Sequence, residues 1–309
     1  MAVKNEKSDV PAKKRKKKLT TKDIAPYIFV LPFVVSFLLF MLYPLISAFS
    51  LSFQQMIPFT NDSEWVGIVN FRRVVNDPGF TIALWNVARY TFWTCLILIP
   101  LPMLLAFIVN GKEIKFKSMF RSMYFMPVLT SSVIAGIVFG QLFSAEPGGA
   151  FNQLVGFFGR DPIRWLNGAG TGMFALVLIA VWRWIGVNMI YFLSGLNGIS
   201  NELYESAEVD GATTWKKFRY ITVPMLKPIT IFVLTISITA GFSLFNESFV
   251  YWGVSSPNNI GATIVILIYR AGFLLNDFGY AAALGVSLFL IVLVVNLVQL
   301  KVMGLFKED

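Results

Sequence analysis

The stretch NELYESAEVDGA (residues 201–212) is a polar interruption between two long apolar segments, and the rest of the chain is arranged around it. Ser200 can cap a helix here, and Glu202 then lies in the first turn, where the helix dipole favours a negative charge. Asp210 and Gly211 form a strong helix-breaking pair, because glycine readily adopts the backbone of a turn. The stretch therefore predicts a short helix that ends in a glycine turn.

A second short helix is predicted directly after this turn, beginning near Thr213 or Thr214. It carries apolar side chains at a spacing of three, which places them along one side of the helix: Trp215, Phe218 and Ile221. Pro224 and Pro228 are expected to end it and to lead into the next apolar segment. The pattern fits a docking element for another protein and, equally well, an amphipathic linker that contacts only lipid headgroups.

The composition indicates a membrane protein. The chain has 309 residues, of which 56% are hydrophobic and 14% charged, whereas about a quarter of the residues of a typical globular protein are charged. A helix needs roughly 20 apolar residues to cross a bilayer. Stretches that meet this requirement lie at about residues 25–50, 88–110, 120–143, 173–196, 228–250 and 278–300. The sequence therefore predicts an all-α membrane domain over residues 25–309 with six transmembrane helices.

A further apolar stretch over residues 260–269 would reach only about 15 Å as a helix, which is too short to cross a bilayer. We expect it to form a short re-entrant or surface helix on the outer side. In the first outer loop, Asn70 is a candidate cap for a short helix. That helix would carry Phe71, Val74 and Val75 on one face, and Asp77-Pro78-Gly79 would end it.

Positive charge orients the predicted spans. The tail over residues 1–24 is rich in Lys and Arg and lies just before an apolar segment, which favours a cytoplasmic tail over a nucleic-acid-binding one. Further Lys and Arg residues lie within residues 111–121 and 195–228 and after the last span. The opposite loops contain Arg72, Arg73, Arg89, Arg160, Arg164 and Arg270. Because Lys and Arg concentrate in cytoplasmic loops, both termini and residues 201–228 are predicted to be cytoplasmic.

Several kinds of site are excluded by residues that the chain lacks. It contains no His, which removes His-based metal sites, His general bases and Ser-His-Asp triads. Cys95 is the single cysteine, so an internal disulfide is impossible. There is no Gly-x-x-x-x-Gly-Lys-Ser/Thr phosphate loop, so the chain has no ATP site of that type.

Arg183 is the one clear charge within a predicted span, and an arginine at mid-membrane costs about 2.5–3.5 kcal/mol on insertion scales. It should therefore face the bundle interior or water, either in a substrate pathway or as a structural hydrogen-bond donor. Aromatic rings and amides of the kind that bind sugars surround it in the sequence. The candidate pathway residues are Trp182, Arg183, Asn188, Tyr191, Asn246, Glu247 and Tyr251.

Glu247 is a natural counter-ion for Arg183. With straight helices rising about 1.5 Å per residue, however, the two residues are expected to lie a turn or two apart rather than in contact. Glu247 is expected instead in an outer vestibule with its neighbours Asn246, Tyr251 and Trp252, which Asn276, Asp277 and Tyr280 could join.

The central stretch resembles the EAA loop of ABC-importer permeases. The resemblance rests on Glu205-Ser206-Ala207, Asp210-Gly211-Ala212 and the following Phe218, Ile221, Pro224 and Pro228. Ser206 stands where the motif usually has Ala, a change between small residues. Residues 66–71, 77–86 and 278–283 resemble the sugar-permease branch. The chain is similar to the MalF-like sugar permease family, nearest to the arabino-oligosaccharide type of Gram-positive bacteria.

This resemblance implies a type I ABC importer (MetI-like) permease fold with a cytoplasmic coupling helix, in a bacterial plasma membrane. It also implies an oligosaccharide substrate, a second permease subunit, two ATPase subunits and an external sugar-binding protein. No cofactor is expected on this chain, since the ATPase would bind ATP and Mg²⁺, and no nucleic acid is expected. The implied coupling residues are Glu205, Ser206, Ala207, Asp210, Gly211, Ala212, Phe218 and Pro224.

Three other functions fit the sequence less well. A permease for a small solute such as glycerol phosphate is possible, although the outer side has no large basic patch to attract an anion. An ion-coupled secondary transporter usually needs His or carboxylates at mid-membrane, and the predicted spans have none there. A membrane-embedded enzyme is disfavoured because no plausible acid–base pair or metal cluster is present.

Overall fold

The computed structural model describes residues 21–56, 62–111, 114–146 and 148–304. The described chain is mainly helical and divides into two compact units, residues 1–48 and 49–309. Most of the predicted basic tail, residues 1–20, lies outside the described residues.

The first unit is dominated by one long apolar helix. Helix α1 (Thr21–Phe37) continues through the π-helical turn η1 (Leu38–Leu42) into α2 (Tyr43–Leu51). Together they provide a 27-residue candidate span, Ala25–Leu51, in whose apolar window no side chain is buried within the chain. A helix that is apolar on all sides and unburied is suited to contact with lipid or with another membrane helix. The predicted first span is present.

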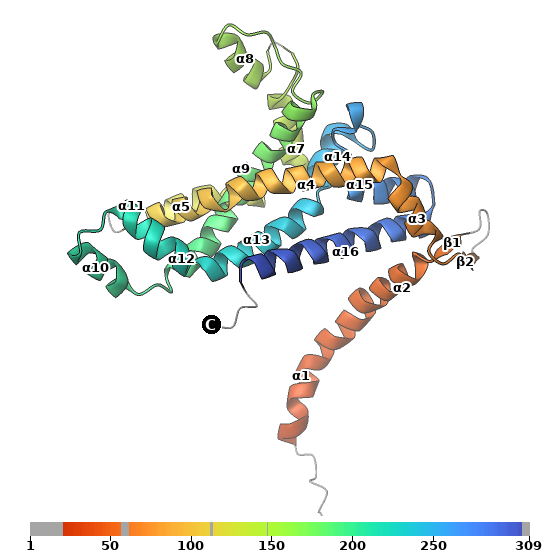
Figure 1. Cartoon of the computed structure of the whole chain (residues 1–309), viewed down its shortest axis with the longest axis horizontal. Helices are drawn as coiled ribbons and strands as arrows, with labels where there is room; N and C mark the ends of the chain where they lie inside the picture. Colours follow the sequence, from red (N-terminus) through yellow and green to blue (C-terminus); the bar gives the residue numbers. More distant parts are fainter. Residues whose placement is uncertain (1–20, 57–61, 112–113, 147, 305–309) are drawn as a thin grey trace, which may run out of the picture. The chain divides into compact units, whose positions relative to one another are not determined.

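The second unit contains four further long apolar helices. Helix α4 (Pro78–Leu98) continues through α5 (Pro100–Asn110), and the other three are α9 (Ala169–Leu196), α13 (Lys227–Phe242) and α16 (Phe278–Val302). Helix α4 packs against α9 and α13, and α13 also packs against α16 (Figure 1). These helices correspond to four of the predicted spans.

The remaining predicted span is bent rather than straight. Helix α6 (Lys117–Phe125) passes into a 3-10 turn, η2 (Met126–Leu129), and α7 (Ser132–Leu142) then leaves at 94°. Pro127 lacks an N–H group, and Thr130 takes up an extended backbone, so the helical hydrogen bonds do not continue. The span predicted over residues 120–143 is therefore a bent pair of helices rather than one straight helix. Among the described residues there are five candidate spans, or six if this bent pair counts as one.

Short elements lie at the two ends of the second unit. Helices α3 (Val69–Asn76), α14 (Asn246–Trp252) and α15 (Ile264–Tyr269) gather at one end, whereas α10 (Asn201–Val209) and α11 (Thr214–Lys217) lie at the other (Figure 1). Helix α15 and the π-helical turn η5 (Arg270–Leu274) form the expected short apolar helix, and α8 (Ala150–Phe157) belongs to the loop after α7.

The segment around α3 corrects one prediction. Strand β1 (Gln54–Met56) pairs antiparallel with β2 (Ser63–Trp65), and α3 follows with Ile68 at its N-cap. Asn70 does not cap α3: it is buried inside the first turn, and its amide donates to the carbonyls of Ser52 (3.1 Å) and Gln54 (2.8 Å). These backbone acceptors satisfy the amide, so it ties the hairpin to α3.

The expected apolar face of α3 is only partly right. Val74 is 1% exposed, whereas its neighbour Val75 is 76% exposed. Successive residues of a helix point about 100° apart, and α3 is turned so that Val74 faces the bundle and Val75 does not. Val74 belongs to a core formed by α3, α4, α13, α15 and α16, whose buried members include Ala83, Val87, Ile264 and Leu284.

A second core lies where α5, α9 and the start of α13 meet. Its fully buried members are large apolar side chains that include Met189, Phe192 and Leu226. Phe218, from the segment after α11, also belongs to this core. The polar interruption between α9 and α13 is therefore anchored in the same packing that holds the two helices together.

Candidate functional site

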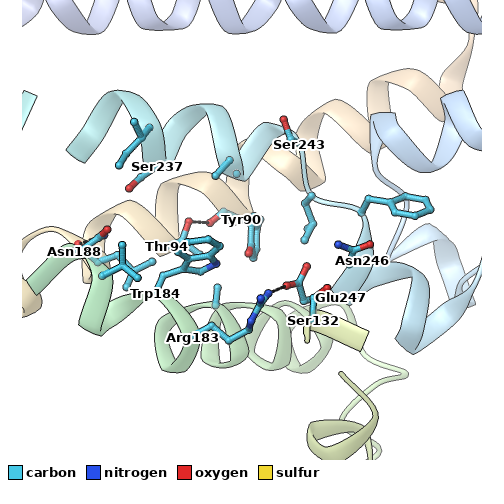
Figure 2. A pocket seen from close by; sticks show the side chains of 18 of the residues that line it. Tyr90, Thr94, Ser132, Arg183, Trp184, Asn188, Ser237, Ser243, Asn246 and Glu247 are labelled. Carbon is cyan, nitrogen blue, oxygen red and sulfur yellow. Dashed lines mark hydrogen bonds and ion pairs between the residues drawn. The ribbon is translucent and has the colours of Figure 1, made fainter. Parts of the chain in front are cut away.

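A polar cavity of about 410 Å³ lies inside the second unit, between α4, α9, α13 and the start of α14. Its volume is within the range of small-molecule binding sites, about 300–1,000 Å³. Aromatic rings from three elements line it: Tyr90, Trp184, Tyr191 and Phe245. Hydroxyl and amide groups also line it: Thr94, Ser132, Asn188, Ser237, Ser243 and Asn246. Figure 2 shows Tyr90, Trp184 and Asn246 around the same space, on separate parts of the chain.

An ion pair stands at one side of this cavity. The Nη1 atom of Arg183 lies 2.6 Å from Oε1 of Glu247, and the two side chains are only 11% and 12% exposed. Figure 2 shows Arg183 reaching from α9 toward Glu247 at the start of α14. The guanidinium carbon lies 5.6 Å from the centre of the Trp184 ring, and Nη2 donates to the Thr130 carbonyl at 3.5 Å.

This contact overturns the expectation that Arg183 and Glu247 lie a turn or two apart. That estimate carried the fifth span straight through Glu247, but α13 ends at Phe242 and residues 243–245 are not helical. Helix α14 begins afresh at Asn246, with Glu247 in its first turn, where the helix dipole favours a carboxylate. These non-helical residues interrupt the regular helical rise on which the estimate relied, and the long arginine side chain reaches the carboxylate.

Five of the seven predicted pathway residues line the cavity: Arg183, Asn188, Tyr191, Asn246 and Glu247. The buried Asn188 amide donates to the Leu98 carbonyl at 2.9 Å, which joins α9 to the end of α4. Trp182 and Tyr251 are not among the lining residues. Trp182 packs on the ring of Phe139 (5.2 Å between centroids), and Tyr251 packs on that of Trp252 (5.5 Å).

The expected outer vestibule separates into two places. Asn246 and Glu247 line the cavity, whereas Asp277 and Tyr280 join a polar cluster between α3 and α16. In that cluster Arg73 pairs with Asp277 at 2.6 Å and lies over the Tyr280 ring, 4.4 Å from its centre. The Tyr280 hydroxyl donates to Asp77 at 2.6 Å. Asn276 does not line the cavity, and Trp252 donates its indole N–H to the carbonyl of Leu166.

The sequence reasoning missed the polar side chains that α4 and α13 contribute. Tyr90 and Thr94 on α4 are four residues apart and share a face, and Thr94 Oγ1 donates to the Tyr90 carbonyl at 2.8 Å. Ser237 and Ser243 line the cavity from the opposite wall. Hydroxyl residues at helical spacing in an otherwise apolar span were the available signal on α4.

The predicted helix–turn–helix is present between α9 and α13. The Ser200 hydroxyl accepts from the backbone N–H of Glu202 at 3.3 Å and caps α10, and Thr213 caps α11 in the same way. Gly211 has a φ of +74°, a left-handed conformation that glycine adopts without penalty. The N–H of Ala212 closes the turn on the carbonyl of Ala207 at 2.8 Å.

The prolines do not end the second helix as expected. Helix α11 runs through a π-helical turn, η3 (Phe218–Thr222), into α12 (Val223–Met225), and the chain breaks only at Leu226. Pro224 lies in the first turn of α12 and Pro228 in the first turn of α13. Pro228 is tolerated because a first-turn N–H has no partner within the helix, whereas Pro224 lies in a continuous helical run, directly after the π-helical turn η3.

The segment from α10 to α12, residues 201–225, packs against the helix bundle and is stabilised by contacts within the segment. Phe218 is buried, and its ring lies 5.1 Å from that of Phe107 on α5. The hydroxyls of Tyr204 and Thr222 share a 2.9 Å hydrogen bond, which joins α10 to η3. Lys217 pairs with Glu208 at 2.6 Å across the glycine turn. The two helices are therefore held as one piece against α5.

The predicted coupling residues lie mostly on the outside of this piece. Glu205, Ser206, Asp210, Gly211 and Pro224 are exposed, Ala207 and Ala212 are half-buried, and Phe218 is buried. Two large apolar side chains beside them, Val209 (89% exposed) and Trp215 (65% exposed), also face outward. In the described chain, no group of three or more His, Cys, Asp or Glu residues is placed to hold a metal ion.

Comparison with known proteins identifies a family. Residues 15–302 match the family described as the binding-protein-dependent transport system inner membrane component. The arabinooligosaccharides transport system permease protein AraP of Bacillus subtilis (strain 168) is 48% identical over 289 residues, which cover 94% of this chain and 91% of that protein. The lactose transport system permease protein LacF of Rhizobium radiobacter is 32% identical, with coverages of 90% and 93%.

The fold is also found among solved structures. A chain of a bacterial ABC transporter involved in the import of the acidic polysaccharide alginate superposes with a TM-score of 0.79 at 24% identity, covering 93% of this chain and 97% of that one. A chain of the alginate transporter in complex with its alginate pentasaccharide-bound periplasmic protein gives 0.80 at 23% identity, covering 92% and 94%.

Proposed function

The chain belongs to the binding-protein-dependent transport system inner membrane component family, and on that premise we propose that it forms half of the translocation pathway of an ATP-driven oligosaccharide importer. It is a multi-pass membrane permease subunit and not an enzyme. The predicted resemblance to the sugar permeases of ABC importers is confirmed, as is the predicted all-helical MetI-like fold.

One observation carries the proposal for a pathway: a polar cavity lies inside an apolar helix bundle, between two helices that flank residues 201–225. Four residues separate the end of α9 at Leu196 from the start of α10, and one residue separates the end of α12 from the start of α13. Helices α9 and α13 both line the cavity. A displacement of residues 201–225 is therefore passed to two of its walls without an intervening flexible loop.

The cavity lining supports a carbohydrate substrate. Relatives with 48% and 43% identity are named as arabino-oligosaccharide permeases. Flat rings such as Trp184 and Tyr191 can cover the C–H faces of a sugar, and the side chains of Asn188 and Ser237 can exchange hydrogen bonds with its hydroxyls. Sites for small molecules usually combine apolar and aromatic walls with a few placed polar groups, which is the arrangement here.

Residues 201–225 are proposed as the docking element for an ATPase subunit on the cytoplasmic side. Their exposed surface carries Glu205, Asp210 and Trp215, and the contacts behind it hold α10 and α11 as a rigid lever. Two ATPase subunits, which would bind ATP and Mg²⁺, would move this lever and its counterpart in a second permease subunit. Closure of the ATPase pair would then shift the bundle between two states.

The experiment uses the complete complex, reconstituted in liposomes with its binding protein. Uptake of labelled arabinotriose should require ATP and should persist when the proton gradient is collapsed. Uptake that stops with the gradient and continues without ATP would identify a secondary transporter instead.

The lever is tested by Gly211→Pro. Proline cannot adopt the φ of +74° found at Gly211, so the variant should assemble poorly or hydrolyse ATP without transport. The matched control is Gly304→Pro, which changes a glycine of φ +77° beyond the end of α16. Normal transport by Gly211→Pro would disprove the lever.

A further inference from the structure

The side chains that line the cavity, rather than the fold, determine which sugar charge the cavity can accept. The same fold occurs in a transporter of an acidic polysaccharide, so the arrangement of helices is compatible with an anionic saccharide. Among the described residues that line the cavity, Arg183 and Glu247 are the two with a formal charge. At 2.6 Å they neutralise each other, and the lining has no net charge.

The guanidinium of Arg183 has N–H groups that make no short hydrogen bond. Nη1 is bonded to Glu247, and Nη2 makes only a long contact of 3.5 Å with a carbonyl. Nε is buried and has no hydrogen-bond partner in the described part of the chain. A guanidinium can receive a carboxylate through two parallel N–H groups, and here one carboxylate of the protein already stands beside it.

Resting on the proposed function, we propose that Glu247 is a built-in counter-anion that makes the cavity select neutral oligosaccharides. Its carboxylate already occupies Nη1 of Arg183, so the carboxylate of a uronic acid that binds Arg183 would lie beside it. A second carboxylate there would face a like charge in a poorly solvated place, which is unfavourable. An amino sugar is rejected for the opposite reason, since its ammonium would meet a guanidinium. A neutral sugar leaves the pair intact.

Each residue of the pair, without its partner, would favour a sugar of the opposite charge. Without Glu247, Arg183 would present its Nη groups to the cavity beside the Trp184 ring, a suitable site for a carboxylate. Without Arg183, Glu247 would present an anion suited to an ammonium group. If the pair served only to join α9 to α14, we would expect a different result. Loss of either residue would then destabilise the complex without changing the charge of the sugar that binds.

Binding is measured on the purified complex in detergent without the binding protein, so that its selectivity does not intervene. Saturation-transfer NMR would compare three trisaccharides: neutral arabinotriose, anionic trigalacturonate and the cationic trimer of glucosamine. The wild-type complex should bind only arabinotriose. Glu247→Gln should raise the affinity for trigalacturonate at least about tenfold, roughly the value of one charge-assisted hydrogen bond.

Arg183→Gln gives the mirror-image test and should raise the affinity for the glucosamine trimer at least about tenfold on the same basis. The double variant Arg183→Gln/Glu247→Gln, which replaces both charged groups with neutral amides, should bind arabinotriose and gain neither charged sugar. If Glu247→Gln does not assemble, Arg183→Gln still tests the proposal. Wild-type complex that binds trigalacturonate as well as arabinotriose would refute it without any variant.

The outcomes separate this proposal from the function on which it rests. If arabinotriose binds and Trp184→Ala weakens its binding, but no single-charge variant gains a charged sugar, the counter-anion role is wrong and the sugar pathway stands. If no trisaccharide gives a signal and Trp184→Ala changes nothing, the cavity is not a sugar site, and both proposals fail.

Discussion

Gly186→Ala should destabilise the protein, because α9 meets α6 there with no room for a side chain. A Cβ atom on Gly186 would overlap the backbone carbonyl of Tyr124 and would lie 2.7 Å from the backbone nitrogen of Phe125. Unlike the end of a flexible side chain, a backbone segment cannot rotate aside. The two helices would have to separate by about 1–2 Å before the contact reached the roughly 3.5 Å of ordinary van der Waals approach.

The size of the effect follows from this geometry. Overpacking a core usually costs about 1–3 kcal/mol, and the upper end applies because the obstacle is a backbone. For a chain of this size about 3 kcal/mol corresponds to a fall in Tm of roughly 6 °C, at about 2 °C per kcal/mol. The separation would also move the Thr130 carbonyl, which follows α6 and accepts from Arg183, so sugar binding should weaken as well.

The assay is thermal unfolding of the purified complex in detergent, followed by tryptophan fluorescence. The matched control is Gly170→Ala in the same helix, where a Cβ meets nothing within 4 Å. Alanine is preferred to glycine within a helix by about 1 kcal/mol, so the control should unfold at the wild-type temperature or slightly above it. If the two variants unfold at the same temperature, α6 and α9 do not approach as closely as described here.

Three further changes test other contacts. Tyr204→Phe removes the hydrogen bond to Thr222 and, at about 1 kcal/mol, should loosen α10 and lower the sugar transported per ATP hydrolysed; an unchanged ratio would show that this bond does not contribute to coupling. Tyr280→Phe removes the bond to the Asp77 carboxylate, worth about 1.5–3 kcal/mol; Tm should fall while arabinotriose affinity stays constant, and a lost affinity would place Tyr280 in the pathway. Asn152→Ala should lower Tm by several degrees, because its buried amide accepts or donates five hydrogen bonds within residues 144–165; an unchanged Tm would show that this loop is held by other contacts.

The helix–turn–helix was predictable because its determinants are local. The caps at Ser200 and Thr213 and the turn at Gly211 each depend on residues within four positions along the chain. The straight spans were predictable for a similar reason, since apolar length alone identifies a membrane helix. Neither the caps and turn nor the apolar length predicts which helices pack against each other.

The bend in the third span shows why a proline residue alone does not predict where a helix bends or ends. Pro26 and Pro32 lie inside α1 without ending it, whereas Pro127 coincides with a 94° bend. The side chain is the same, but at Pro127 the following Thr130 leaves the helical conformation and Arg183 contacts its carbonyl. A freed carbonyl in an apolar bundle needs such a partner, and that partner comes from another helix.

The Arg183–Glu247 contact was missed because the break before Glu247 has no local signal. Residues 243–245 contain neither glycine nor proline. The break is stabilised by tertiary contacts: Leu244 is buried, and the Ser248 hydroxyl donates to the Gly261 carbonyl at 2.6 Å, which ties α14 to a distant part of the chain. Sequence reasoning therefore identified both charged cavity residues but only Tyr191 of the four aromatic ones, and it did not identify the contact that joins the two charges.

Helix α9 links substrate selection to coupling. At one end it leads directly into α10 and the exposed residues proposed to meet the ATPase, and near its middle it carries Arg183, Asn188 and Tyr191 into the cavity. Glu247 stands on α14, beyond the break that separates it from α13. A movement of residues 201–225 would therefore displace Arg183 with α9, while the break allows Glu247 to keep its place. On this argument the ion pair is the point in the cavity wall where the proposed ATP-driven motion would first change the surroundings of a bound sugar.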